Sequence, residues 1–208
     1  MMGQLDLIPG LVPALDSSMG QWWTPPRLAE RIAREFPIEG HVLEPTAGAG
    51  NLAVALAKQA EFSLLEVNEI DPRWTPSLRH RLRAERELGS VKVHETDWLE
   101  TSWDDRRWFD WCVMNPPDES KRGVHVVDFL ERALLGADHT VALIRLNALT
   151  TGERTRRVWK RAHVRQLVML ASRPAFGPSG GEQEWCVVWF GPEAGPVHPT
   201  VWWEDGWS

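Results

Sequence analysis

A glycine-rich segment between two apolar stretches is the first feature that could do chemistry. Residues 48–53 read Gly-Ala-Gly-Asn-Leu-Ala and fit the pattern G-x-G-x-x-[GA] between a predicted strand and a predicted helix. Such glycines let the backbone approach a nucleotide, and a carboxylate about 20 residues further on can accept hydrogen bonds from two ribose hydroxyls. Glu69 has that place. The segment therefore predicts a nucleotide-cofactor site, although an ordinary small-residue turn would read the same way.

The acid before the glycines helps to choose between cofactors. Glu44 stands at the end of the first predicted strand, directly before the glycine-rich turn. A carboxylate there would repel the pyrophosphate of NAD, whereas it suits a cofactor with an ammonium group. S-adenosylmethionine (SAM) has such an ammonium and carries no phosphate. The electrostatics favour SAM, and NAD is the alternative.

An Asn-Pro-Pro-Asp sequence at residues 115–118 is the second feature. It follows an apolar strand, at the carboxyl edge where open α/β sheets bind ligands. Pro116 and Pro117 stiffen the turn and lack backbone N–H groups, which leaves carbonyls exposed. The side-chain oxygen of Asn115 and the carbonyl of Pro116 could then accept both hydrogen bonds of one planar amine, and so hold its nitrogen in line for attack on a methyl group. In isolation, the same residues could equally form a strand-terminating turn.

The elements that must position these residues alternate between strands and helices. The prolines that follow Thr24 predict the start of a first helix, which runs to about residue 36. Further helices are expected over residues 51–60, 75–88, 124–135 and 152–161. Strands are expected over residues 41–44, 62–67, 91–94, 109–114, 140–146, 164–170 and 185–190. This alternation predicts an α/β fold, a mostly parallel seven-stranded sheet with helices on both faces.

Composition limits the class of protein. The chain has 208 residues, a formal net charge of -6, and 43% hydrophobic and 25% charged residues, which is typical of a globular domain. No apolar run approaches the roughly 18 residues of a membrane span, and no secretory signal is recognised. Cys112 and Cys186 lie in apolar runs and predict buried, reduced thiols, a cytoplasmic location and no metal site. An acidic chain is not built to hold duplex DNA by bulk charge.

In their order along the chain, these segments resemble the motifs of DNA adenine-N6 methyltransferases of bacteria and phages. Residues 21–25 are similar to a leading motif that packs against the methionine end of SAM, and they include Trp23, Thr24 and Pro25. Residues 44–50 resemble the cofactor loop and include Glu44, Pro45, Ala47, Gly48 and Gly50. Glu69, next to Ile70, falls at the ribose-binding acid, and Asp97 with Trp98 falls where the adenine ring of SAM is held. Residues 115–117 are similar to the catalytic Asn-Pro-Pro.

The resemblance covers roughly residues 20–190, including a closing Arg-Pro-x-Phe segment at 173–176 and the strand at 185–190. It implies a Rossmann-like class I methyltransferase fold with SAM as the cofactor. Residues 1–20 are then an N-terminal arm, 21–190 the methyltransferase domain, and 191–208 a Trp-rich tail expected to dock on the same chain. It also implies methyl transfer to an exocyclic amine, with adenine N6 in DNA as the leading substrate. RNA and a protein glutamine amide are alternatives.

One residue departs from the family's pattern. The aromatic residue that follows Asn-Pro-Pro in this family, and stacks on the flipped adenine, is replaced by Asp118. Stacking contributes roughly 1–3 kcal/mol per base, and aspartate cannot supply it. Three hypotheses follow. A nearby Trp98 or Trp185 supplies the platform, or Asp118 binds a different amine, or the chain is a catalytically silent SAM-binding subunit.

Target recognition must come from a further source, because no separate recognition domain is apparent. Loops, the N-terminal arm, a protein partner or a second copy of the chain could supply it. The basic cluster at residues 154–165 is interpreted as a phosphate-contacting surface. The cluster at residues 79–86 is interpreted as a solvated helix face.

Overall fold

A computed structural model describes most of the chain. The described residues are 23–83, 85, 90–101, 109–117, 123–150, 152–161, 163–171, 174, 184–193 and 200–202. Within these ranges, no helix combines the length and the apolar character that a membrane span requires.

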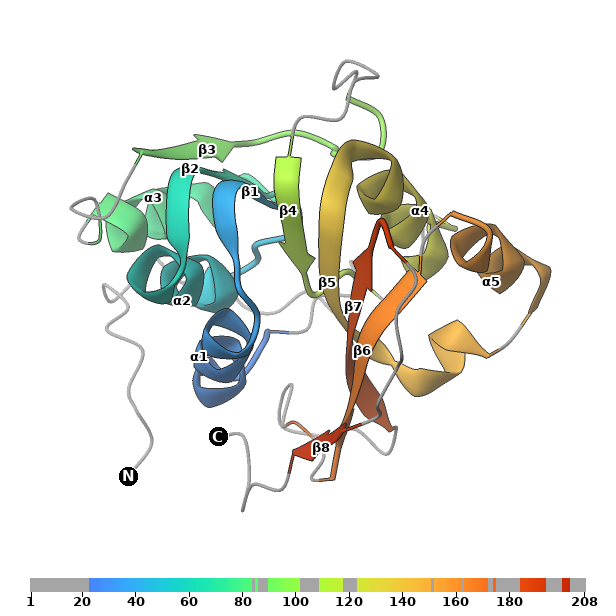
Figure 1. Cartoon of the computed structure of the whole chain (residues 1–208). Helices are drawn as coiled ribbons and strands as arrows, with labels where there is room; N and C mark the ends of the chain where they lie inside the picture. Colours follow the sequence, from blue (N-terminus) through green and yellow to red (C-terminus); the bar gives the residue numbers. More distant parts are fainter. Residues whose placement is uncertain are drawn as a thin grey trace.

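A single eight-stranded sheet forms the centre of the molecule (Figure 1). Its strands are β1 (Glu39–Glu44), β2 (Glu61–Asn68), β3 (Ser90–His94), β4 (Phe109–Met114), β5 (Ala137–Arg145), β6 (His163–Leu170), β7 (Trp185–Gly191) and β8 (Thr200–Trp202). Their spatial order is β3-β2-β1-β4-β5-β7-β6-β8. All neighbouring pairs are parallel except those of β7, which is antiparallel to β5 and β6. The predicted α/β class and mostly parallel sheet are confirmed.

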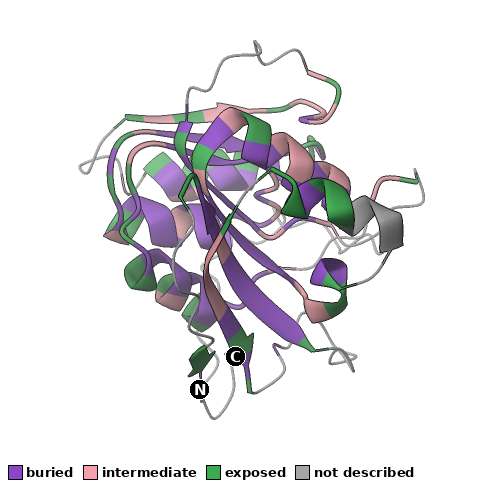
Figure 2. Cartoon of the chain, turned by 45° about the vertical axis from the view of Figure 1, so that its right-hand side comes forward, coloured by how far each residue is buried: buried purple, intermediate pink, exposed green. Residues whose placement is uncertain are grey.

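Helices cover both faces of this sheet. They are α1 (Pro26–Glu35), α2 (Asn51–Gln59), α3 (Thr75–Arg83), α4 (Val126–Gly136) and α5 (Gly152–Trp159), with a 3-10 turn at Leu146–Leu149. Residues of α1, α2 and α3 share one hydrophobic core with the sheet, whereas residues of α4 and α5 share the other. Successive residues of β1 point to opposite faces of the sheet, so Val42 packs in the first core and Leu43 in the second. In Figure 2 the central strands are coloured as buried along much of their length.

Local signals explain where the helices begin. Pro25 is the N-cap of α1 and Pro26 lies in its first turn, as the sequence predicts. Helix α4 begins two residues later than expected, with His125 as its N-cap, because the Asp128 carboxylate accepts from the His125 N–H at 2.9 Å there. Since Gly136 ends α4 and Ala137 begins β5, no connecting loop separates them, and β5 starts earlier than predicted.

The predicted number of seven strands is wrong, because the tail contributes β8. This strand pairs in parallel with the end of β6, and Trp202 is buried. The guanidinium of Arg31 lies 4.9 Å from the centre of the Trp202 ring. The tail therefore docks on its own chain up to Trp202, as expected. The other tail tryptophans lie outside the described residues.

Candidate functional site

The segments that follow β1, β2, β3 and β4 meet at the carboxyl edge of the sheet and enclose a pocket. Trp23 and Thr24, which precede helix α1, also line this pocket. The structure brings most of the predicted site residues together as lining residues, namely Trp23, Thr24, Glu44, Pro45, Ala47, Gly48, Glu69, Ile70, Asp97, Trp98, Asn115 and Pro117. A pocket at the carboxyl ends of adjacent parallel strands is the usual ligand site of this architecture.

The remaining predicted residues have other places. Pro25, Gly50 and Pro116 are not lining residues, and Asp118 lies outside the described part of the chain. Gly50 is the N-cap of α2, with φ +84°, and a Cβ there would collide with the side chain of Leu78. Glycine is thus favoured at this position by its left-handed backbone conformation, and Leu78 would also have to move to make room for a Cβ.

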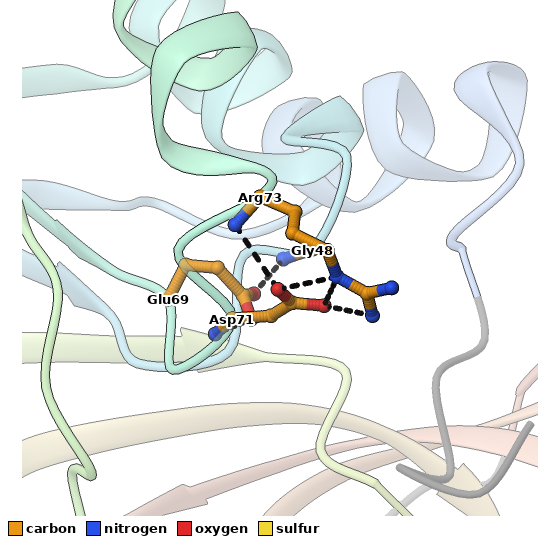
Figure 3. A network of polar contacts seen from close by, with 4 residues as sticks. All are labelled: Gly48, Glu69, Asp71 and Arg73. Atoms are coloured by element: carbon orange, nitrogen blue, oxygen red, sulfur yellow. Dashed lines mark hydrogen bonds and ion pairs between the residues drawn. The ribbon is translucent and has the colours of Figure 1, made fainter. Parts of the chain in front are cut away.

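The glycine turn is fastened to the loop after β2 through Glu69. The Gly48 N–H donates to Glu69 Oε2 at 2.6 Å, and the Asp71 N–H donates to Glu69 Oε1 at 2.8 Å. The Asp71 carboxylate in turn forms an ion pair with Arg73, whose Nη2 lies 2.6 Å from Asp71 Oδ2 (Figure 3). Burial raises the pKa of the Glu69 carboxyl, while the backbone hydrogen bonds from Asp71 and Gly48 lower it. Both carboxyl oxygens are thereby held in place beside the pocket.

Glu44 is the most deeply buried acid of the pocket. Its side chain is 1% exposed, and its Oε2 atom has no hydrogen-bond partner among the described residues. Burial raises the pKa of the Glu44 carboxyl well above its usual range, the charge of Glu69 raises it further, and that of Arg81 opposes the shift. A buried oxygen without a partner is costly, so a ligand that donates to it would bind with a large gain. An ammonium group is such a donor.

The described lining also has a one-sided charge. Glu44, Glu69 and Asp97 are acidic, and no lysine, arginine or histidine stands among the described lining residues. The lining therefore suits a ligand with a net positive charge. This agrees with the argument from Glu44 against a pyrophosphate.

Asn68, which sequence reasoning missed, holds three of these loops together. Its Nδ2 donates to the carbonyls of Pro45 and Thr96, each at 3.1 Å, and its Oδ1 accepts from the Thr96 hydroxyl at 2.8 Å. Its own carbonyl accepts from the Ala47 N–H at 3.0 Å. Asn68 is 1% exposed. It fixes the acidic loop after β3 relative to the glycine turn, so Asp97 and Glu44 keep a defined separation.

The loop after β3 presents an aromatic wall. Trp98 is buried and stacks on Phe129 of α4, with ring centroids 6.1 Å apart, and Arg132 lies over the Trp98 ring at 5.4 Å. Trp98 and Phe129 both line the pocket. Trp185, the other tryptophan considered as a stacking platform, is buried beside Arg145 and is not a lining residue.

The Asn-Pro-Pro turn lies against the segment before α1. Asn115 Nδ2 donates to Thr24 Oγ1 at 3.1 Å, and the Asn115 carbonyl accepts from the Thr46 hydroxyl at 3.2 Å. Trp23, next to Thr24, packs edge-on against Trp74 with ring centroids 5.0 Å apart. The turn is therefore joined to the glycine loop and to the leading segment in one pocket.

One of the two interpretations of the basic clusters needs correction at Arg81. Arg81 of α3 is not solvated, because its guanidinium donates to the carbonyl of Ala49 and, at 3.0 Å, to Asn51 Oδ1. Burial lowers the pKa of Arg81. On α5, Arg157 lies 2.8 Å from Glu131 and 3.2 Å from Asp128 of α4, so part of this charge is balanced within the chain. The phosphate-contacting role of residues 154–165 stays a prediction.

Both cysteines behave as expected. Cys112 and Cys186 are free and buried, and burial raises the pKa of both thiols. Among the described residues, no cluster of histidine, cysteine, aspartate or glutamate could hold a metal ion.

Comparison with known proteins gives the context for this pocket. Residues 27–142, more than half of the chain, match the model of the family described as methyltransferase small domain. No curated protein sequence matches the chain.

Several solved structures of low sequence identity have the same fold. The methyltransferase subunit of a type I restriction-modification system from Streptococcus thermophilus is 15% identical, with a TM-score of 0.67 over 86% of this chain and 47% of that chain. TYW2 of M. jannaschii, solved in complex with AdoMet, is 17% identical, with a TM-score of 0.57 over 81% and 76%. The tRNA m1G37 methyltransferase of M. jannaschii is 12% identical, with a TM-score of 0.55 over 78% and 47%. At these identities the likeness establishes the fold, and the chain spans about half of the Streptococcus subunit.

Proposed function

Because the chain belongs to the methyltransferase small domain family, we propose that it transfers a methyl group from SAM to an exocyclic amine, namely N6 of adenine in DNA. The observation that carries the proposal is the hydrogen bond between Asn115 and Thr24, which holds the Asn-Pro-Pro turn inside the pocket formed by the glycine loop. A methyl donor and an amine bound in one pocket can react in line.

SAM is the cofactor of this family, and the described pocket fits it. Its ammonium matches the buried Oε2 of Glu44, and its two ribose hydroxyls match the fixed carboxylate of Glu69. Asp97 and Trp98 provide an acceptor and an aromatic wall for the adenine ring. When bound, SAM supplies an electrophilic methyl group on a positively charged sulfur, and that charge suits the acidic lining.

The turn after β4 would prepare the amine. The Asn115 side-chain oxygen and the Pro116 carbonyl accept the two N–H bonds of the substrate amine, which draws its nitrogen toward a tetrahedral geometry with a localised lone pair. Pro116 and Pro117 stiffen the backbone that carries these acceptors. The step would need no nucleophilic side chain of the protein, since the substrate nitrogen itself would attack the methyl group as the bond from that methyl to sulfur breaks and the neutral thioether leaves. The nitrogen would then give up one N–H proton, by way of the Asn115 and Pro116 acceptors, to water.

DNA is preferred over RNA and protein because of the leading motif at residues 21–25, which resembles that of the DNA adenine methyltransferases. One of the similar folds is the methyltransferase subunit of a type I restriction-modification system, and another comes from a structure whose subject is complex assembly in a type I restriction-modification system. We therefore propose that a protein partner or a second copy of the chain contributes target recognition.

Transfer of a tritiated methyl group from SAM to unmethylated DNA, to RNA and to a protein extract tests this function. Incorporation into DNA as N6-methyladenine is the expected result, with none into the other substrates. Incorporation only into RNA or protein would keep the methyltransferase reaction and reject the DNA substrate. Absence of SAM binding in calorimetry would reject the cofactor site itself.

A second candidate function follows from Asp118. If wild-type protein binds SAM but transfers no methyl group, the chain is a cofactor-binding subunit that supports a partner. Asp118→Tyr would then restore an aromatic residue after Asn-Pro-Pro. Methyl transfer by Asp118→Tyr, together with no transfer by the wild type, would support the silent-subunit hypothesis.

Replacing Glu69 with glutamine is expected to lower SAM affinity by about tenfold or more, although the two side chains have the same shape. Both Glu69 oxygens accept backbone N–H bonds, so the NH2 group of glutamine would face a donor at Gly48 or at Asp71. Isothermal titration calorimetry gives the affinity. Glu66→Gln is the matched control, because Glu66 lies in β2, three residues before Glu69, but binds His41 and His94 and is not a lining residue of the pocket. Equal affinities of Glu69→Gln and wild type would contradict the ribose-binding role.

A further inference from the structure

We infer that the Thr24 hydroxyl positions the side-chain amide of Asn115 for catalysis, a role beyond the cofactor contact expected from the leading motif. The inference rests on the proposed function, since it takes Asn115 to be the residue that accepts the amine. Its basis is the 3.1 Å hydrogen bond from Asn115 Nδ2 to Thr24 Oγ1, which joins residues 91 positions apart.

The orientation of the Asn115 amide decides what the substrate meets. An amide turned by 180° would present its NH2 group to the substrate amine, so two donors would face each other. With Nδ2 engaged by Thr24, Oδ1 is directed away from that bond and serves as the acceptor that the amine requires. The Thr46 hydroxyl holds the backbone carbonyl of the same residue, so the side chain turns on a fixed backbone.

Thr24 is itself anchored from the cofactor side. Its carbonyl accepts from Asn51 Nδ2 at 2.9 Å, and Asn51 Oδ1 accepts from Arg81 Nη2 at 3.0 Å. Asn51 is the first residue of α2, directly after the glycine turn, and Thr24 and Asn51 are both buried. A continuous chain of hydrogen bonds therefore runs from α3 through the cofactor loop to the Asn-Pro-Pro turn.

The Thr24 hydroxyl can also donate a hydrogen bond to the cofactor. Since Thr24 Oγ1 accepts from Asn115, its own proton is left for another acceptor, and Thr24 is a lining residue. The carboxylate at the methionine end of SAM has the chemistry of such an acceptor. If the Thr24 hydroxyl donates its proton to this carboxylate, only its oxygen lone pairs face Asn115. The Asn115 side chain must then point its NH2 group toward Thr24 and its Oδ1 toward the substrate.

Thr24→Val and Thr24→Ser separate this role from cofactor binding. Valine keeps the shape of threonine and removes the hydroxyl, so the single-turnover rate at saturating SAM should fall about 10–100-fold. Serine keeps the hydroxyl and should retain most of the rate. SAM affinity, measured by calorimetry, should also fall in Thr24→Val, because valine cannot donate to the carboxylate of SAM, so each rate is measured with that protein saturated with SAM. The midpoint of thermal unfolding reports that both variants fold.

Each outcome decides between explanations. If Thr24→Val loses SAM affinity but keeps the wild-type rate at saturation, Thr24 is a cofactor contact only and the inference is overturned. The same holds if the serine variant is as slow as the valine variant. Asn115→Ala, assayed in parallel, tests the proposed function separately: full activity there rejects amine activation, whereas a slow Asn115→Ala beside a fast Thr24→Val rejects the positioning role alone.

Discussion

Asn115→Ala is expected to reduce the rate constant of methyl transfer by about 10²–10³-fold, the range found when one positioned polar group is removed from a reacting centre. The substitution deletes one of the two acceptors that hold the amine, and it leaves the Thr24 hydroxyl without its donor from Nδ2. The loss should appear in the single-turnover rate at saturating SAM and DNA. SAM affinity should be nearly unchanged, because Glu44 and Glu69, the proposed cofactor-binding acids, are retained.

Asn115→Asp provides a graded comparison. Aspartate keeps an acceptor oxygen toward the amine but cannot donate to Thr24, so its rate should lie between those of wild type and Asn115→Ala. A thermal unfolding midpoint equal to that of wild type would show that the turn after β4 still forms. An unchanged rate in Asn115→Ala would remove the Asn-Pro-Pro turn from the mechanism, whatever the substrate proves to be.

The fold could be predicted from sequence because its strands and helices alternate as local patterns. Each central strand is a short apolar run bounded by turn residues, as in Phe109–Met114. Such a run can be identified as a strand from its own sequence, without knowing which strand it pairs with. The eighth strand was not predictable in this way. Thr200–Trp202 is three residues long, lies in a Gly/Pro-rich tail, and is a strand only because β6 offers it an edge.

For the residues of the site, too, the outcome depends on whether the signal is local in sequence. Residues that belong to contiguous motifs, such as Glu44, Gly48 and Asn115, could be identified because their chemistry and spacing are local. Asn68 and Arg81 could not, since nothing beside them in sequence differs from an ordinary strand end or a basic helix. Their roles arise from contacts with Pro45, Thr96, Ala49 and Asn51 that only the folded chain brings about.

Glu44→Gln is expected to have opposite effects on cofactor binding and on the stability of the free protein. Glutamine cannot supply the negative charge that an ammonium requires, so SAM affinity should fall by about 10²-fold, a value near the lower limit for breaking a buried ion pair. The free protein should be as stable as wild type or more stable at pH 8, because the substitution removes a buried carboxyl whose ionised form lacks a hydrogen-bond partner at Oε2. Calorimetry with SAM and thermal unfolding without it measure the two effects. Glu66→Gln is again the control for removal of a carboxylate.

The pH dependence follows from the raised pKa of Glu44. Since the folded state holds this proton more tightly than the unfolded state, the stabilising contribution is complete below the unfolded pKa of about 4.3 and is lost as the pH rises through the folded pKa. Glu44→Gln should remove this loss, so the variant gains stability relative to wild type as the pH increases.

SAM binding should have the reverse dependence on pH. The ammonium pairs with the ionised carboxylate, so binding to wild type releases the proton of Glu44, and affinity rises with pH up to the folded pKa of that group. Calorimetry in buffers of different ionisation enthalpy counts the released proton, and Glu44→Gln should release fewer protons than wild type. Equal proton release by the two proteins, together with equal SAM affinity, would show that the ammonium binds elsewhere and that the burial of Glu44 serves only the fold.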